Sequence, residues 1–191
     1  MNETQAIRQP ASRRQEQAEV LPDNTHAAFS ANAASLNKAL LQGFLEHQHD
    51  SSVRRTHLFN GRYENIYLDV DRIPQIRELL DEACGHAGRI LGTDRLQAGC
   101  WFNYMPPAAV TTLHSHDDDD ELLSAVYYVE VPEDSGVLLI HQHGRRHAIS
   151  PQAGKFVFFA PDVPHEVSEN RSSRARLSIG INFGRRRDAN D

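Results

Sequence analysis

The spacing of apolar residues divides the chain into a helical first part and a strand-rich second part. From Thr25 onward the spacing is helical and predicts a first helix, carried by Phe29, Leu36, Leu40, Leu41 and Phe44. The alternating run 62–70 predicts a strand. A second helix is predicted from Asp71 to Leu91, because Pro74 suits its first turn and Gly92 ends it.

After Gly92 the pattern changes to short strand-like runs separated by turn signals. The predicted strands are 99–104, 122–131, 136–141, 147–150, 155–159, 166–168 and 176–183. Many short strands with no helix between them are typical of a sandwich or barrel. The predicted fold class is therefore mainly β with N-terminal helices. We expect an arm of loose order over 1–24, a mixed support region over 25–95, an all-β unit over 96–185 and a tail over 186–191.

Charge and composition narrow the class of protein. Charged residues make up 24% of the 191 residues and the formal net charge is −6, which argues against binding to nucleic acid. No apolar run approaches the length of a membrane span, and the N-terminal residues have no apolar core of a secretory signal. Two cysteines, Cys84 and Cys100, cannot make a disulfide framework, so a cytoplasmic location is expected.

The run HSHDDDDE, from His114 to Glu121, is the first candidate for chemistry. Side chains two positions apart on an extended backbone point to the same side, so His114 with His116, or His116 with Asp118, can hold one ion. His165, at the end of a strand-like run, is the best candidate for the third ligand. Two histidines and one carboxylate are typical of non-haem Fe(II) oxygenases, although these ligand types also suit Mn(II) or Zn(II).

A candidate receptor for a carboxylate follows His165. In the alternating run that begins at Arg176, this arginine shares a face with Ser178, and an arginine fork beside a hydroxyl can bind a carboxylate at two points. Tyr128 shares a face with Ser124 on another predicted strand and can offer its hydroxyl to the same carboxylate. Arg174 shares a face with Arg176 and could replace it.

Four motifs occur in order between Trp101 and Gly184: HxH or HxD, LSAVYYV, GxxxFFAPxxxH and RxSIxxN. This succession resembles the 2-oxoglutarate and Fe(II)-dependent oxygenases, and is most similar to a bacterial and phage subgroup related to prolyl hydroxylases. The resemblance implies a double-stranded β-helix, the jelly roll that cupins share, with helices packed on one side. It also implies that His165 is the distal metal ligand and that Arg176 binds the far carboxylate of 2-oxoglutarate.

The first ligand pair stays open within this resemblance. Counting forward from the Pro-Pro loop favours His114 and His116, whereas counting back from LSAVYYV favours His116 and Asp118. We prefer His116 and Asp118, because a carboxylate balances the charge of the ion and matches the HxD of the family; His114 is the alternative first ligand. The catalytic set is then His116, Asp118 and His165, with Arg176, Ser178 and Tyr128 binding the co-substrate.

The activity implied is that of a dioxygenase that uses Fe(II), 2-oxoglutarate and O2 and hydroxylates a C–H bond of a small molecule or amino-acid-like substrate, releasing succinate and CO2. A homodimer is an option, since related β-helix proteins often dimerise. The alternative is a cupin-type metal protein, an isomerase or a 2-oxoglutarate-independent dioxygenase, with His114, His116, Glu121 and His165 as ligands. Arg176 and Ser178 argue against it, because a cupin needs no carboxylate receptor on that strand.

Overall fold

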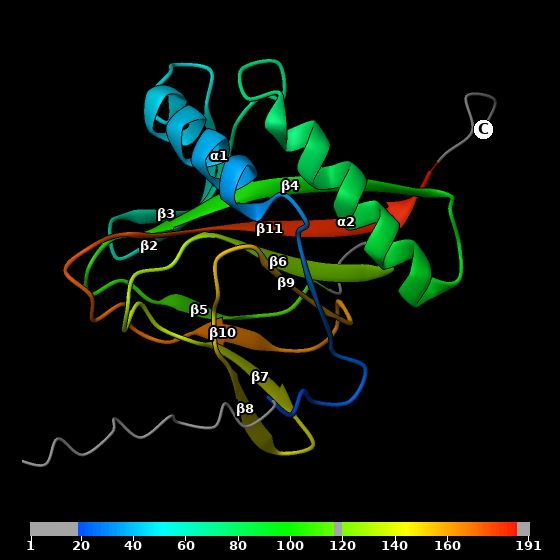
Figure 1. Ribbon diagram of the computed structural model, residues 1–191. Coiled ribbons are helices and arrows are strands. Elements are labelled where there is room, and N and C mark those ends of the chain that lie inside the picture. Colours follow the sequence, from blue (N-terminus) through cyan, green and yellow to red (C-terminus); the bar gives the residue numbers. More distant parts are fainter. Residues whose placement is uncertain (1–18, 117–119, 187–191) are drawn as a thin grey trace, which may run out of the picture.

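A computed structural model describes residues 19–116 and 120–186 of the chain (Figure 1). The helices are α1 (Ala33–His47) and α2 (Gln75–Leu91). The strands are β1 (His26–Phe29), β2 (Arg54–Phe59), β3 (Arg62–Tyr67), β4 (Leu96–Met105), β5 (Thr111–His114), β6 (Leu123–Glu130), β7 (Leu138–Gln142), β8 (Arg145–Ile149), β9 (Lys155–Phe159), β10 (His165–Val167) and β11 (Arg176–Arg185). Neither helix is long and apolar enough to cross a membrane.

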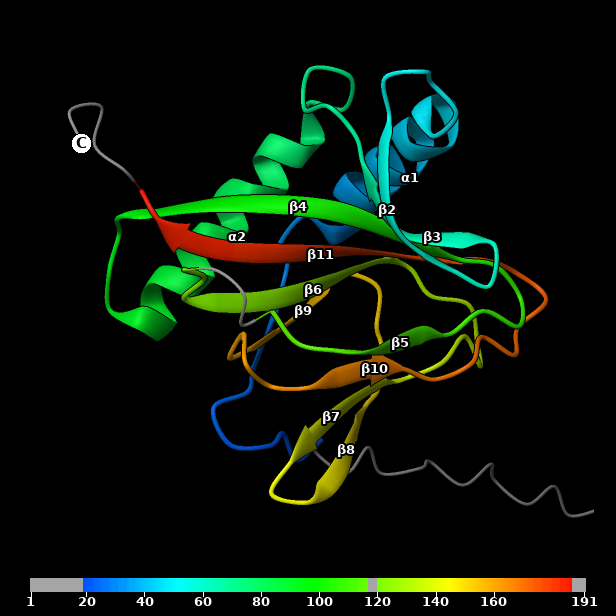
Figure 2. The same cartoon turned by 180° about the vertical axis from the view of Figure 1, so that it is seen from behind.

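The strands form two antiparallel sheets that face each other. The larger sheet has the order β1-β9-β6-β11-β4-β3-β2, and the smaller one has the order β5-β10-β7-β8. Both helices lie on the outer face of the larger sheet, and the smaller sheet lies on its opposite face (Figures 1 and 2). The predicted class, mainly β with N-terminal helices, is confirmed.

Two apolar clusters hold these layers together. One lies between the helices and the larger sheet, and it includes Leu40 and Phe44 of α1 and Leu79 of α2. The second lies between the sheets, and it includes Ile140 and Val157. All five residues of β9 are buried, which follows from its position inside the larger sheet with a packed layer on each face.

The predicted start of the first helix at Thr25 is wrong. Residues 26–29 form β1, which pairs with β9 from His26↔Phe158 to Phe29↔Lys155, and the helix begins only at Ala33. Pairing along an open sheet edge outweighs the helical spacing here, because it gives this segment backbone hydrogen bonds to β9. Two further strands, β2 and β5, were not predicted from the sequence.

Candidate metal centre and carboxylate pocket

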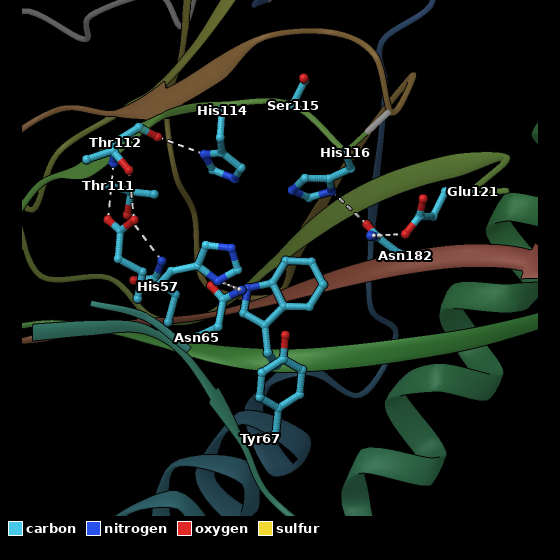
Figure 3. Close-up of a pocket in the computed structure, with 13 residues that line it drawn as sticks. His57, Asn65, Tyr67, Thr111, Thr112, His114, Ser115, His116, Glu121 and Asn182 are labelled. Atoms are coloured by element: carbon cyan, nitrogen blue, oxygen red, sulfur yellow. Dashed lines mark hydrogen bonds between the residues drawn. The ribbon is translucent and has the colours of Figure 1, made fainter. Parts of the chain in front are cut away.

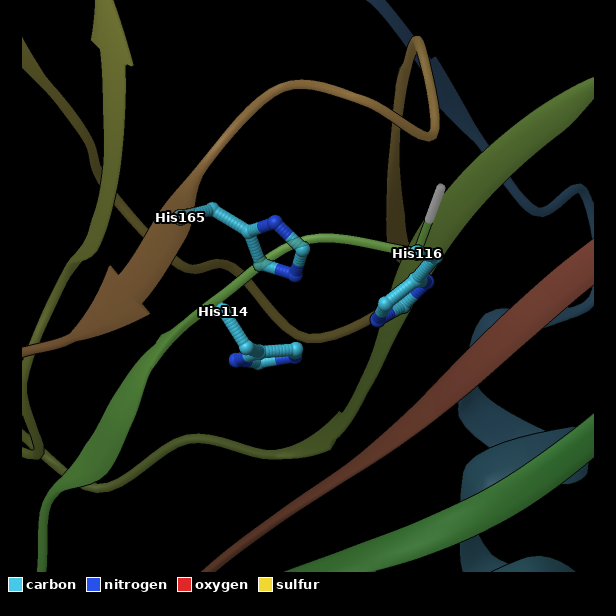
Figure 4. Close-up of side chains that lie close together, drawn as sticks. All are labelled: His114, His116 and His165. Atoms are coloured by element: carbon cyan, nitrogen blue, oxygen red, sulfur yellow. The ribbon is translucent and has the colours of Figure 1, made fainter. Parts of the chain in front are cut away.

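Three histidines meet at one end of the space between the sheets. His114 is the last residue of β5, His116 follows two residues later, and His165 opens β10. The antiparallel register places His165 directly opposite His114, and the centroids of these two rings are 4.3 Å apart. Each of the three rings offers a nitrogen within 4.8 Å of the nitrogens offered by the other two. Figure 4 shows the three rings gathered around one point.

Backbone carbonyls fix the tautomer of two of these rings. The Nδ1 atom of His114 lies 2.7 Å from the carbonyl oxygen of Thr112, and Nδ1 of His165 lies 2.9 Å from that of Val163. A carbonyl oxygen only accepts, so each Nδ1 must carry the hydrogen and donate it. The Nε2 atom of each ring therefore keeps a free lone pair for a ligand.

The tautomer of His116 is fixed by a side chain. Its Nδ1 lies 2.8 Å from Oδ1 of Asn182 (Figure 3). The same Nδ1 lies 3.0 Å from Oγ of Ser124. The Nδ2 group of Asn182 donates to Oε1 of Glu121 at 3.0 Å, which sets the orientation of the amide. Its Oδ1 therefore faces the imidazole, and His116 also donates from Nδ1 and leaves Nε2 free.

Burial keeps two of these imidazoles neutral. Desolvation lowers the pKa of His116, and it lowers the pKa of His165 to about 3, with the neighbouring His114 acting in the same direction. A neutral ring with a free Nε2 is the form that binds a metal. The ring nitrogens of three histidines that converge fit a divalent cation such as Fe(II), Mn(II) or Zn(II).

The strand that carries His114 is held by two charged residues of β3. Glu64 is buried and accepts from Thr112 twice, from the backbone N–H at 3.1 Å and from the hydroxyl at 2.8 Å. Arg62 pairs with Glu64 at 3.0 Å, and burial lowers the pKa of the guanidinium. Thr112 is the residue whose carbonyl orients His114. This pair of residues was not predicted from the sequence, although the alternation within 62–67 does place Arg62 and Glu64 on one face.

A second polar site lies farther along the same interior face. Arg176 is fully buried, and its Nη1 donates to the carbonyl oxygens of Gly136 at 2.9 Å and Ser135 at 3.4 Å. Its Nε and Nη2, together with the hydroxyl of Tyr128, are buried and have no hydrogen-bond partner among the described residues. Buried donors without an acceptor lower the stability of the fold, so these three donors are suited to bind a ligand that supplies the acceptors.

The register of β11 brings these donors together. Ser178 lies opposite Tyr128 of β6, and the guanidinium carbon of Arg176 lies 5.0 Å from the centroid of the Tyr128 ring. Burial raises the pKa of Tyr128 to about 12, so its hydroxyl keeps the hydrogen that it can donate. Burial also lowers the pKa of Arg176, a cost that a carboxylate placed against the guanidinium would offset. Two free N–H directions beside a phenol match the two oxygens of a carboxylate.

Two further candidates from the sequence, Arg174 and Glu121, lie outside the two sites, and a third is not described. Arg174 is largely exposed and pairs with Glu130 at the surface, so it does not share the buried position of Arg176. Asp118 lies outside the described residues. Glu121 does not belong to the cluster of converging nitrogens but reaches it through Asn182, which argues against the cupin ligand set.

A cavity of about 410 Å³ opens beside the histidines (Figure 3). Its wall includes the metal-site residues His114 and His116, and Trp101, whose ring stands edge-on to His116 at a centroid distance of 5.5 Å. The hairpin of β2 and β3 contributes another side of the wall, with His57, Asn65 and Tyr67. The cavity is therefore in direct contact with the place where a metal would bind, as a substrate pocket must be.

Residues 100–184 match the model of the 2OG-Fe(II) oxygenase superfamily. A Pseudomonas putida prolyl-4-hydroxylase superposes with a TM-score of 0.67 at 26% identity, over 86% of this chain and 93% of that one. An oxidoreductase of the 2OG-Fe(II) oxygenase family from Burkholderia pseudomallei gives a TM-score of 0.63 at 22% identity, over 87% of each chain. The epimerase SnoN, in complex with Fe3+, alpha ketoglutarate and nogalamycin RO, gives 0.67 at 14% identity, over 85% of this chain and 79% of that one. A comparison with curated protein sequences found no match.

The matched segment, which carries all three histidines and Arg176, belongs to the 2OG-Fe(II) oxygenase superfamily. The resemblance read from the motifs is confirmed, and so is the double-stranded β-helix that it implied. As a member of this family, the protein is a non-haem Fe(II) and 2-oxoglutarate-dependent enzyme, whose cofactors are Fe(II), 2-oxoglutarate and O2. The neutral imidazoles and the unpaired donors around Arg176 fit the metal and the co-substrate respectively.

Proposed function

We propose that this enzyme hydroxylates a C–H bond of a small molecule or an amino-acid-like substrate, with conversion of 2-oxoglutarate to succinate and CO2. The observation that carries the proposal is the pairing of two unsatisfied sites on one interior surface. One is a set of three histidines with free Nε2 atoms, and the other is a buried arginine with two unused nitrogens. When bound, Fe(II) and 2-oxoglutarate supply the activation of O2.

For the metal we propose His114, His116 and His165 as ligands. One nitrogen of each ring lies close to those of the other two, and because each Nδ1 already has an acceptor, Nε2 is the nitrogen free to bind the metal. Asp118, which we preferred on the sequence alone, becomes the alternative to His114. A centre of three imidazoles leaves positions open for the co-substrate and O2, as a centre with one carboxylate would.

For the co-substrate we propose that Arg176 and Tyr128 bind the distal carboxylate of 2-oxoglutarate and that Ser178 contributes its hydroxyl. Ser124, Val126 and Tyr128 of β6 lie opposite Asn182, Gly180 and Ser178 of β11. This row of facing residues runs from the histidine end to the arginine. A molecule that spans the row can contact both sites.

For the substrate we propose the cavity beside His114 and His116. Its aromatic residues Tyr67 and Trp101 offer apolar contacts, while Asn65 and His57 offer hydrogen bonds. Its volume of about 410 Å³ suits a small molecule or one side chain of a peptide. The prolyl-4-hydroxylase similarity supports hydroxylation of an amino-acid-like group. A homodimer and a cytoplasmic location stay predictions.

The test is an anaerobic titration of Fe(II)-loaded protein with 2-oxoglutarate, followed by the visible charge-transfer band of the chelated co-substrate. We expect a band in the wild type, loss of the band in Arg176→Met at the same 2-oxoglutarate concentration, and loss of metal binding in His165→Ala. His114→Ala should lose the band and Asp118→Ala should keep it.

The reverse pattern, with the band kept in His114→Ala and lost in Asp118→Ala, would restore Asp118 as the ligand. A wild type that binds metal but shows no band would contradict the proposed co-substrate site. Succinate release and substrate hydroxylation can then be followed by mass spectrometry with candidate small molecules and proline-containing peptides.

A further inference from the structure

We propose that Asn182 and Glu121 are positioning residues of the metal centre. They hold His116 in its ligating tautomer, and they place behind it the carboxylate that a ligand set of three histidines lacks. The inference rests on the proposed ligand set, because it assigns a role to residues that act only through His116. Figure 3 shows the chain of contacts from the imidazole through the amide to the carboxylate.

The direction of each hydrogen bond in this chain is determined. Glu121 Oε1 can only accept when ionised, so the group of Asn182 that faces it at 3.0 Å must be the donating Nδ2. Oδ1 of the same amide then faces Nδ1 of His116 at 2.8 Å and accepts its hydrogen. Ser124 donates its hydroxyl to that Oδ1 at 3.0 Å and supports the same orientation.

His116 differs from the other two histidines in the kind of acceptor that it uses. His114 and His165 donate to the backbone carbonyls of Thr112 and Val163, which exist whatever side chains stand there. The hydrogen bond of His116 depends on two side chains, Asn182 and Ser124. Of the three histidines, His116 is therefore the one whose ring can lose its hydrogen-bond acceptor through a single substitution.

The carboxylate of Glu121 can act on His116 through the amide of Asn182. Among the described residues it forms no ion pair, and its second oxygen, Oε2, is buried with no hydrogen-bond partner. Glu64, which holds the strand of His114, is by contrast paired with Arg62. A carboxylate that accepts from the amide polarises it, so that Oδ1 accepts more strongly and His116 becomes the more basic ligand.

The experiment measures Co(II) affinity by competition with a chromogenic chelator, without 2-oxoglutarate, together with the visible spectrum of the bound Co(II). Asn182→Leu removes the acceptor and keeps the size of the side chain, and we expect its affinity to fall about 10- to 100-fold. Glu121→Gln keeps an acceptor for the amide but removes the charge, so its affinity should fall less and its Co(II) bands should shift.

The double variant Asn182→Asp, Glu121→Gln exchanges the amide and the carboxylate while it preserves both hydrogen bonds. It should restore the affinity lost in Asn182→Leu, which a merely structural role would not predict. Asn65→Leu removes an amide from the same cavity that contacts His57 and none of the three histidines, and it should bind Co(II) as the wild type does. Circular dichroism of each metal-free variant checks that it is folded.

Wild-type affinity and spectrum in Asn182→Leu would overturn the inference, and so would a double variant no better than Asn182→Leu. If Asn182→Leu does not fold, the remaining variants test the inference. Wild-type affinity and spectrum in Glu121→Gln, or loss of Co(II) binding in the double variant, would then overturn it. Failure of the wild type itself to bind Co(II), or binding that survives His165→Ala, would instead contradict the proposed metal centre.

Discussion

The two faces of β11 carry opposite kinds of residue on the same backbone. Toward the helices the strand presents a wholly apolar row, Leu177, Ile179, Ile181 and Phe183, all buried. Toward the smaller sheet it presents Arg176, Ser178, Gly180 and Asn182. The first face packs against side chains of α1 and α2, whereas the second faces the histidines and the carboxylate pocket.

One face of β11 therefore contributes to stability and the other to ligand binding. The apolar face is complete within the chain, since its residues contact one another and remove apolar surface from water. The interior face is incomplete, because Arg176 and the neighbouring Tyr128 of β6 keep buried donors that have no hydrogen-bond partner in the described part of the chain. Such a face lowers the stability of the isolated protein and raises its affinity for a ligand that supplies the missing acceptors.

The largest effect on stability is expected from the apolar face. Ile179→Ala should lower the free energy of unfolding by about 3 kcal/mol, because it leaves a cavity between the sheet and the helices. Arg176→Met on the interior face should leave the free energy of unfolding unchanged or raise it, because it removes a buried charge. Urea denaturation of both variants measures this contrast. A loss in Arg176→Met as large as that in Ile179→Ala would contradict the separation of the two faces.

The next largest effect is a dependence of the free energy of unfolding on pH, which comes from the buried His165. The folded protein holds the pKa of His165 near 3, below that of an unfolded chain, so the unfolded state takes up the proton first as the pH falls. The stability that comes from a neutral His165 is complete above pH 6.5 and is lost as the pH falls toward 3. Between pH 7 and pH 5 the metal-free protein should lose about 2 kcal/mol through this group.

Urea denaturation at the two pH values, repeated on His165→Asn, tests this expectation. The variant should lose less stability over the same interval, because it has no imidazole to protonate in the unfolded state. An equal loss in both proteins would assign the pH dependence to other groups.

The smallest effect concerns the packing of Trp101 against β11. A Cβ atom at Gly180 would lie 2.4 Å from Cε2 of Trp101, so Gly180→Ala must displace the indole and should cost about 1 kcal/mol. Trp101 is the one tryptophan of the chain, so its fluorescence reports this displacement directly. Gly99→Ala is the matched control, since a Cβ at Gly99 meets nothing within 4 Å. Unchanged fluorescence in Gly180→Ala would contradict the contact.

Much of the architecture could be predicted from periodicity alone. The alternation from Arg176 to Phe183 predicted a strand with one polar face, and α2 follows the apolar spacing that ends at Gly92. The turn expected between the predicted strands 136–141 and 147–150 is also present, as the β7–β8 turn at His143 and Gly144, both with positive φ. These patterns are local, and the packing of the protein agrees with them.

Tertiary contacts decided what local patterns could not. Residues 26–29 form a strand because the edge of β9 is open to pairing. The spacing of apolar residues within 25–44 gives no indication of that pairing. The short strand β5 depends on β10 and on Glu64, which is 48 positions away from Thr112 in sequence.

The candidate site shows the same division. The sequence by itself indicated His116, His165 and Arg176 as candidates by their positions within ordered motifs, and the resemblance carried by those motifs implied the class of chemistry. It could not choose between His114 and Asp118 by counting residues, since both lie two positions from His116. The pairing of β5 with β10 brings His114 against His165, and the pairing of β6 with β11 brings Asn182 to His116. These neighbours come from different strands, and only the folded chain brings them within bonding distance.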